Sequence, residues 1–140
     1  MAKGHYKFML MLERLTENFE TTFAMPDEDI MRQNVKDGEF MYFILKGQVK
    51  VTVENLSGHG GRVRWLSESQ YFGEIAMFYN CERQATIKSN SYNTYARINK
   101  TFFDQFCLSY PQARKALREL IWHYNDSNQV FRKSLILHMP

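Results

Sequence analysis

The chain has few cysteines and no long apolar run. Only Cys81 and Cys107 occur among its 140 residues. Two thiols are too few for the disulfide set on which small secreted domains depend, so we expect the protein to reside in the reducing cytosol. No stretch of about eighteen apolar residues is present to form a transmembrane helix, and a start that carries Lys3, Glu13 and Glu17 is unlike a signal peptide.

Metal-binding and catalytic patterns are missing as well. The histidines, His5, His59, His123 and His138, form no metal-spaced pair, and no nucleophile stands next to a base in a recognisable arrangement. We therefore expect neither a metal site nor an enzyme. The formal net charge of +3 is too small to indicate a nucleic-acid partner by itself.

Apolar residues make up 44% of the sequence and aromatic residues 15%, so a chain of this length can bury a core as one domain. Within Tyr6–Phe23, four apolar side chains recur at helical spacing and predict an amphipathic helix: Phe8, Leu12, Leu15 and Phe19. The cluster Met25–Asp29 ends this pattern.

The period then changes to two, which is typical of strands. Asp37–Gly38 predicts a two-residue hairpin turn with positive φ at both positions, and Lys46–Gly47 predicts a second turn. Many short strands with frequent turns favour a barrel or jelly roll. The predicted strands are Asp29–Val35, Met41–Leu45, Gln48–Glu54, Arg62–Leu66, Gln84–Lys88 and Thr94–Ile98.

Helical spacing returns after Ile98. Asn99 is suited to cap a short helix that carries Phe102, Phe103 and Phe106. Pro111 is well placed as the first residue of a last helix, which we expect to weaken over 125–128, a run of poor helix formers.

The residue types needed to bind a sugar phosphate occur in two segments, Phe72–Ala76 and Arg83–Thr86. Gly73 permits a close backbone approach, and a helix that opens at Glu74 would present free N–H groups to an anion. Arg83 can bind a phosphate bidentately, and the Glu74 carboxylate can accept hydrogen bonds from a ribose. From the spacing alone, an ordinary Glu–Arg pair on a surface helix is the simpler interpretation.

The complete pattern resembles the phosphate-binding cassette of cyclic-nucleotide-binding domains. That motif runs Phe-Gly-Glu-aliphatic-Ala and then Arg-x-Ala-Thr or Ser, and it stands here in full as Phe72-Gly73-Glu74-Ile75-Ala76 and Arg83-Gln84-Ala85-Thr86. The segment 41–49 is similar to the strand pair that precedes the cassette in this family. The resemblance covers the chain from Thr22 to its end.

The resemblance implies a role for each of these residues. Glu74 would bind the ribose 2′-hydroxyl and Arg83 the cyclic phosphate, with backbone N–H groups of Ile75, Ala76, Gln84 and Ala85 completing the cradle. The last helix would close over the purine of cAMP or cGMP as a lid, with Tyr124, Ser127 and Asn128 facing the base. For Tyr124, core packing is an equally good interpretation.

The chain departs from the family pattern in three places. The loop before Met41 is short, with Asp37-Gly38-Glu39 in place of a longer turn. Gln84 stands where many channels and cGMP-dependent kinases carry threonine, and Tyr124 stands where hyperpolarisation-activated channels carry arginine. The preference between cAMP and cGMP is therefore open.

Within the family, the distance from Arg83 to Pro111 and the tail 132–138 resemble those of hyperpolarisation-activated and cyclic-nucleotide-gated channels. This implies a sensor domain at the cytoplasmic face of a membrane, whose partner is the rest of an ion channel, with a tetrameric parent as one option. Two alternatives stay open: a regulatory domain of a cyclic-nucleotide-dependent protein kinase, which Tyr79-Asn80-Cys81 also resembles, and a structural domain of the same fold without a ligand.

These expectations divide the chain into three parts. Residues 1–24 would form an N-terminal helical linker, residues 25–98 a β-roll with the phosphate-binding cassette, and residues 99–140 the C-terminal helices including the lid. The fold class is then α+β, an antiparallel β-roll or jelly roll with a short cassette helix and helices at both ends.

Overall fold

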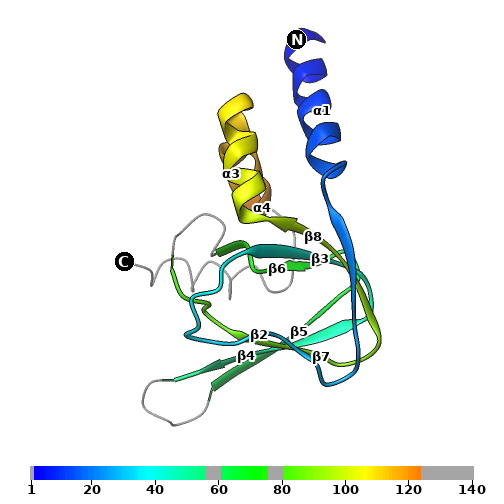
Figure 1. The fold of residues 1–140 in the computed structure, drawn as a ribbon, viewed down its shortest axis with the longest axis vertical. Helices are drawn as coiled ribbons and strands as arrows, with labels where there is room; N and C mark the ends of the chain where they lie inside the picture. Colours follow the sequence, from blue (N-terminus) through cyan, green and yellow to red (C-terminus); the bar gives the residue numbers. More distant parts are fainter. Residues whose placement is uncertain (1, 56–60, 76–80, 124–140) are drawn as a thin grey trace.

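The computed structural model of the chain describes residues 2–55, 61–75 and 81–123. No helix within these three stretches is both long and apolar enough to cross a membrane. In chain order, the elements are α1 (Ala2–Thr16), β1 (Glu20–Ala24), β2 (Asp29–Met31), β3 (Phe40–Lys46), β4 (Gln48–Glu54), β5 (Gly61–Ser67), β6 (Tyr71–Phe72), β7 (Thr86–Ser89), β8 (Asn93–Asn99), α3 (Lys100–Ser109) and α4 (Gln112–His123) (Figure 1).

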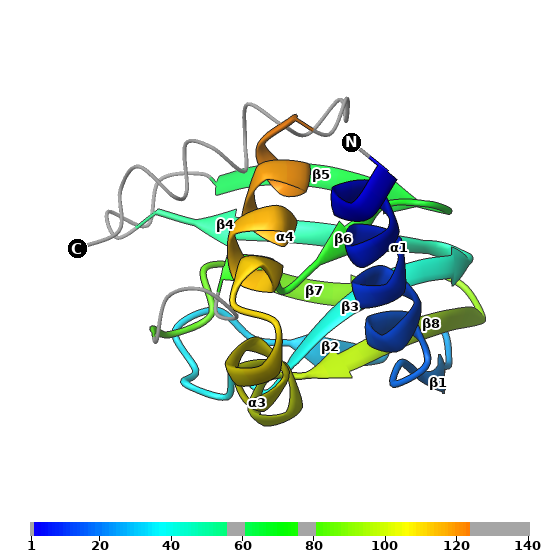
Figure 2. The same ribbon diagram turned by 90° about the horizontal axis from the view of Figure 1, so that it is seen from above.

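The strands form two four-stranded sheets, in the orders β1-β8-β3-β6 and β2-β7-β4-β5. Every pair of neighbouring strands in them is antiparallel. Figure 1 shows the sheets stacked face to face, and Figure 2, seen from above, shows α1, α3 and α4 over the sheet that contains β3 and β8. The predicted antiparallel roll with helices is confirmed.

One hydrophobic cluster fills the space between the sheets. Tyr42, Ile44 and Tyr95 reach it from the first sheet, and Val49 and Val51 reach it from the second. The alternation along β4 that predicted a buried valine face is therefore correct, because successive side chains of a strand point to opposite sides.

A second cluster lies between the helices and the outer face of the first sheet. Met11 of α1 and Phe103 of α3 pack there against Met41 of β3 and Ile98 of β8. Met41 points to the helices while its neighbour Tyr42 points into the roll. The first sheet is therefore covered on both faces, which explains why β3 is apolar along most of its length.

The predicted helix over Tyr6–Phe23 is wrong in its second half. Helix α1 ends at Thr16, and Glu20–Ala24 instead forms β1, which pairs with β8. Phe19 fits the helical spacing, but its ring stacks on Phe43 at a centroid distance of 5.2 Å. The β-branched pair Thr21–Thr22 favours a strand, and the edge of β8 supplies its backbone partners.

The predicted hairpin turn at Asp37–Gly38 is also wrong. Strands β2 and β3 belong to different sheets, so the segment between them crosses from one layer to the other. Neither Asp37 nor Gly38 has positive φ, whereas Gly47 does, at 110°. The turn at Lys46–Gly47 is confirmed, since β3 ends and β4 begins on either side of Gly47.

Boundaries of the predicted strands agree with the structure to within one residue except at two places. The second strand stops at Met31 instead of Val35, and the strand predicted from Gln84 begins at Thr86. The periodicity gave no sign of the two-residue strand β6.

The helices after the roll begin near the predicted residues. Asn99 caps α3, where its side chain accepts a hydrogen bond from the Phe102 N–H at 3.1 Å. Helix α4 begins one residue after Pro111. Asp104 of α3 links the two helices through Arg114 of α4 at 2.8 Å, and it also pairs with Lys100 within α3 at 2.9 Å.

Candidate functional site

Arg83 is a buried charged side chain of the predicted site with several hydrogen-bond partners. It is only 4% exposed. Its Nη1 donates to the Gly73 carbonyl at 3.2 Å and its Nη2 to the Phe40 carbonyl at 3.0 Å. Its Nε donates to Asp37 Oδ1 at 2.8 Å. Two backbone carbonyls and one carboxylate therefore fix the guanidinium.

The backbone of Arg83 is fixed as well. Its N–H donates to the Val35 carbonyl and its own carbonyl accepts from the Asn34 N–H, both at 2.8 Å. These bonds attach the segment before β7 to the crossing segment between β2 and β3. The side chain consequently starts from a rigid position, which limits the entropy lost when it binds a ligand.

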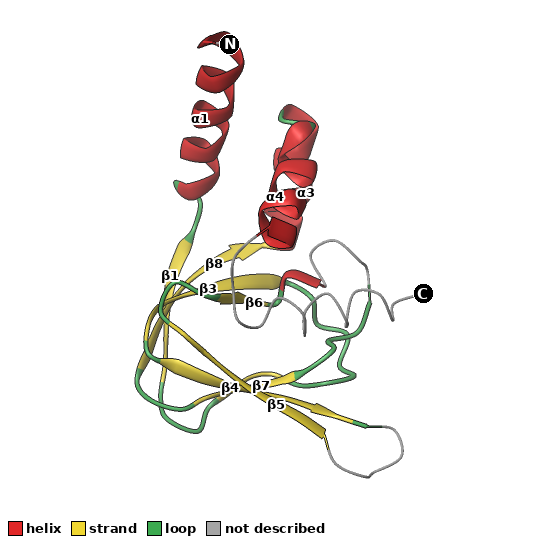
Figure 3. Ribbon diagram, turned by 180° about the vertical axis from the view of Figure 1, so that it is seen from behind, coloured by secondary structure: helices red, strands yellow, loops and turns green. Residues whose placement is uncertain are grey.

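The first half of the cassette begins where β6 ends. Gly73 has φ of 85°, and a Cβ there would lie 2.9 Å from the Phe40 oxygen and 3.1 Å from Arg83 Nη1. Helical structure begins at Glu74, as predicted, and Figure 3 shows this short helix after β6. Both side chains that follow Gly73 are buried, Glu74 at 3% and Ile75 at 9% exposure.

The residues after Arg83 serve mainly to fix the local fold. Gln84 Nε2 donates to the Glu82 carbonyl at 3.1 Å. Ala85 belongs to the cluster inside the roll, and Thr86 Oγ1 accepts from the Gln33 N–H at 3.0 Å. The side chain of Ala85 thus packs in the core and the Thr86 hydroxyl has an acceptor role in the fold, while its proton remains available as a donor.

Cys81 lies close to this segment, and its partly buried thiol is a weaker acid than an exposed one. Burial raises the pKa of the Cys81 thiol above its ordinary value, and this outweighs the lowering by the hydrogen bond to Gln84 and by the charge of Arg83. A thiol with a raised pKa carries less of the reactive thiolate at neutral pH. We therefore interpret Cys81 as a small side chain that fills space in this loop.

The structure brings together Phe72, Gly73, Glu74 and Ile75 on one side and Arg83 on the other, through the bond from Arg83 to the Gly73 carbonyl. Ala76, Tyr124, Ser127 and Asn128, which were also predicted to contact the ligand, lie outside the described residues.

Sequence reasoning missed two partners of the guanidinium, Asp37 and the Phe40 carbonyl. The short loop before Met41 was the available signal for Asp37. A backbone carbonyl such as that of Phe40 leaves no signal in the sequence.

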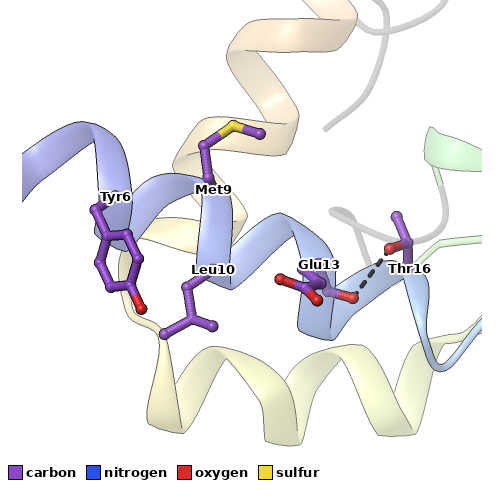
Figure 4. A pocket seen from close by; sticks show the side chains of 5 residues that line it. All are labelled: Tyr6, Met9, Leu10, Glu13 and Thr16. Atoms are coloured by element: carbon purple, nitrogen blue, oxygen red, sulfur yellow. Dashed lines mark hydrogen bonds between the residues drawn. The ribbon is translucent and has the colours of Figure 1, made fainter.

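A separate hollow of about 390 Å³ runs along helix α1 (Figure 4). It is lined by Tyr6, Met9, Leu10, Glu13 and Thr16. The charged group in this lining is a carboxylate, so the hollow does not suit an anionic ligand. The cassette is the better candidate for a phosphate site.

Comparison with known proteins places these features in a family. The family model for the cyclic nucleotide-binding domain matches residues 22–110. The cAMP-dependent protein kinase regulatory subunit of Dictyostelium discoideum is 32% identical over 96 residues, which are 66% of this chain and 29% of that protein. Mouse potassium/sodium hyperpolarization-activated cyclic nucleotide-gated channel 2 is 30% identical over 91 residues, 65% of this chain and 10% of the channel. The chain thus spans less than a third of either relative.

Solved structures agree on the fold. The catabolite activator protein of Thermus thermophilus superposes with a TM-score of 0.70 at 17% identity, covering 91% of this chain and 57% of that one. The regulatory subunit of a cAMP-independent protein kinase A from Trypanosoma brucei gives 0.68 at 19% identity, covering 89% and 43%. At these identities the likeness concerns the fold alone.

Proposed function

The chain belongs to the cyclic-nucleotide-binding domain family, and we propose that it binds cAMP or cGMP at the site formed by Gly73, Glu74 and Arg83. The observation that carries this proposal is the buried guanidinium of Arg83, which two backbone carbonyls hold beside the start of a helix. Burying a charged side chain costs free energy. Binding an anion is a function that accounts for a buried charge at this position.

The phosphate would be bound at Arg83. Guanidinium N–H groups donate to phosphate oxygens with good geometry. The first N–H groups of a helix have no carbonyl partner within that helix, so those of Ile75 and Ala76 are suited to add donors. The N–H groups of Gln84 and Ala85 complete the cradle in this proposal.

Glu74 would recognise the sugar. An ionised carboxylate offers acceptors and no donor, which suits a ribose 2′-hydroxyl and rejects a second anionic group. Because its side chain is 3% exposed, the bond would be shielded from competing water. In the same proposal, Tyr124, Ser127 and Asn128 of the lid face the purine.

The parent protein is proposed to be a membrane ion channel that this domain regulates from the cytoplasmic side. The likeness to hyperpolarization-activated channels supports this assignment. The second candidate is the regulatory part of a cyclic-nucleotide-dependent protein kinase, which a match of similar identity supports. Expression of the full-length parent with patch-clamp recording and with kinase assays, each with and without ligand, separates the two.

Calorimetric titration of the purified domain with cAMP and with cGMP tests ligand binding. We expect saturable heat and a rise in melting temperature, since a ligand at about 100 times its Kd adds roughly 2.7 kcal/mol of stability. Absence of both effects at millimolar concentrations of either nucleotide would exclude the proposed function and leave the alternative of a structural domain of the same fold without a ligand.

Hydrogen exchange of the same samples tests the lid. Ligand contacts made only in the closed state shift the population towards closure. We expect protection to rise in the cassette and over residues 120–128. Protection confined to the cassette would refute the lid and leave ligand binding intact.

A further inference from the structure

Among the partners of Arg83 within the described residues, Asp37 is the one that is neither buried nor part of the backbone. The side chain of Asp37 is 47% exposed, whereas that of Arg83 is 3% exposed. Asp37 lies in the segment between β2 and β3, outside any strand. Its carboxylate can therefore leave the guanidinium and become hydrated without unfolding any strand or helix.

The bond to Asp37 uses a donor that a phosphate would need. A guanidinium has five N–H donors, and three bonds to Asp37, Gly73 and Phe40 are already formed. A phosphate that takes Nε–H must displace Asp37. A phosphate that takes only the remaining Nη hydrogens must bind next to the Asp37 carboxylate, and two negative charges so close together repel each other.

Asp37 is not required to orient the guanidinium. The Gly73 and Phe40 carbonyls already hold both terminal nitrogens, and the aliphatic part of Arg83 is buried with them. Removing the Asp37 carboxylate therefore removes a competitor for Arg83 and leaves the positioning of Arg83 in place.

We propose that Asp37 is an internal competitor for the phosphate site, which binds Arg83 in place of the ligand and so lowers the affinity of the domain for cyclic nucleotides. This inference rests on the proposed function. Asp37 lies in a segment that also contacts Arg83 through the Val35 and Phe40 carbonyls, and this places its carboxylate at the guanidinium.

The test measures the Kd of cAMP and of cGMP by calorimetry for the wild type, Asp37→Asn and Asp37→Ala. Both variants are expected to bind about 3–10 times more tightly. Glu39→Gln is the matched control, because it removes one exposed negative charge from the same loop without touching Arg83. It is expected to change Kd less than twofold, which separates competition at Arg83 from a general effect of charge.

The outcomes distinguish this inference from the proposed function. If the wild type binds and both Asp37 variants bind equally or more weakly, the competition is refuted while the binding function stands. If Glu39→Gln tightens binding as much as Asp37→Asn, the competition is refuted as well. If only the Asp37 variants bind, the competition is supported while the proposed function of the wild type fails, and if no form binds either nucleotide, both fail.

Discussion

Arg83→Ala is the substitution whose effect on stability follows most directly from the structure. It removes the donors to the Gly73 and Phe40 carbonyls and leaves Asp37 without its cation. The unfolded chain does not form these interactions, so the substitution raises the free energy of the folded state alone. Arg83 is thus expected to contribute to the stability of the domain itself, in addition to its proposed contact with the ligand.

The magnitude can be worked out bond by bond. Leaving a buried carbonyl without a donor costs about 1–3 kcal/mol, and the two carbonyls here are only partly buried, so we take the lower half of that range for each. The pair with Asp37 adds no more than about 1 kcal/mol, because that carboxylate is half-exposed and screened by solvent. The two carbonyls thus account for roughly 2–4 kcal/mol, and the ion pair raises the expected loss to at most about 5 kcal/mol.

Urea denaturation, followed by circular dichroism, measures this loss. Domains of ordinary stability, about 5–15 kcal/mol, survive it, so the variant should fold and unfold at lower urea. Its affinity for cyclic nucleotide should fall at least tenfold. Arg32→Ala is the matched control: Arg32 is 72% exposed and pairs with Asp29 at 3.3 Å, so its loss should cost less than about 1 kcal/mol.

An Arg83→Ala variant that unfolds at the same urea concentration as Arg32→Ala would refute the argument. The carbonyls would then be satisfied by water, and the anchoring of the guanidinium would have no measurable effect on folding.

Three further predictions use other parts of the site and the helices. Gly73→Ala should lower the free energy of unfolding by about 1–3 kcal/mol, because the φ of Gly73 is 85° and the new Cβ would meet the Phe40 oxygen. Gly38→Ala, at a position without positive φ, should lower it much less. Equal losses of stability in thermal unfolding would contradict this prediction. Gln84 stands where the resemblance leads us to expect threonine, so cAMP should bind at least as well as cGMP, and Gln84→Thr should improve cGMP binding. A tenfold preference of the wild type for cGMP in calorimetry would refute this prediction. Burial alone would raise the pKa of Asp104, but its hydrogen bonds to Arg114 and Lys100 outweigh burial and lower the pKa. Asp104→Asn should therefore be less stable than the wild type at neutral pH, and this difference should vanish as the pH falls below the ordinary carboxyl range and through the lowered pKa. A difference in stability that persists in acid would contradict this origin.

Local patterns predicted the elements whose determinants lie within a few residues. Strand β4 was predicted with its observed bounds, since alternating valines face the roll. Asn99 was recognised as a cap because the N–H it binds is three residues away. In the same way, the start of a helix at Glu74 follows from the residues next to it.

Contacts between distant segments could not be predicted in this way. Phe19 fits a helical stripe, and only its contact with Phe43 shows that the chain has left the helix. Asp37 resembled a hairpin turn because its neighbour is glycine, yet its side chain binds Arg83, 46 residues further along the chain. The resemblance predicted which residues form the site. The contact of Arg83 with the Phe40 carbonyl of β3 could not be predicted, because the spacing of apolar residues does not show which distant segments meet.

The beginning of β3 joins two regions that are otherwise separate. The Phe40 carbonyl accepts from Arg83, and the carbonyl of the preceding residue, Glu39, accepts from the N–H of Lys100, the first residue of α3. Adjacent peptide groups thus anchor the guanidinium and the first turn of a helix on the outer face of the sheet. The position of the guanidinium and the start of α3 therefore depend on the same short piece of backbone at the beginning of β3.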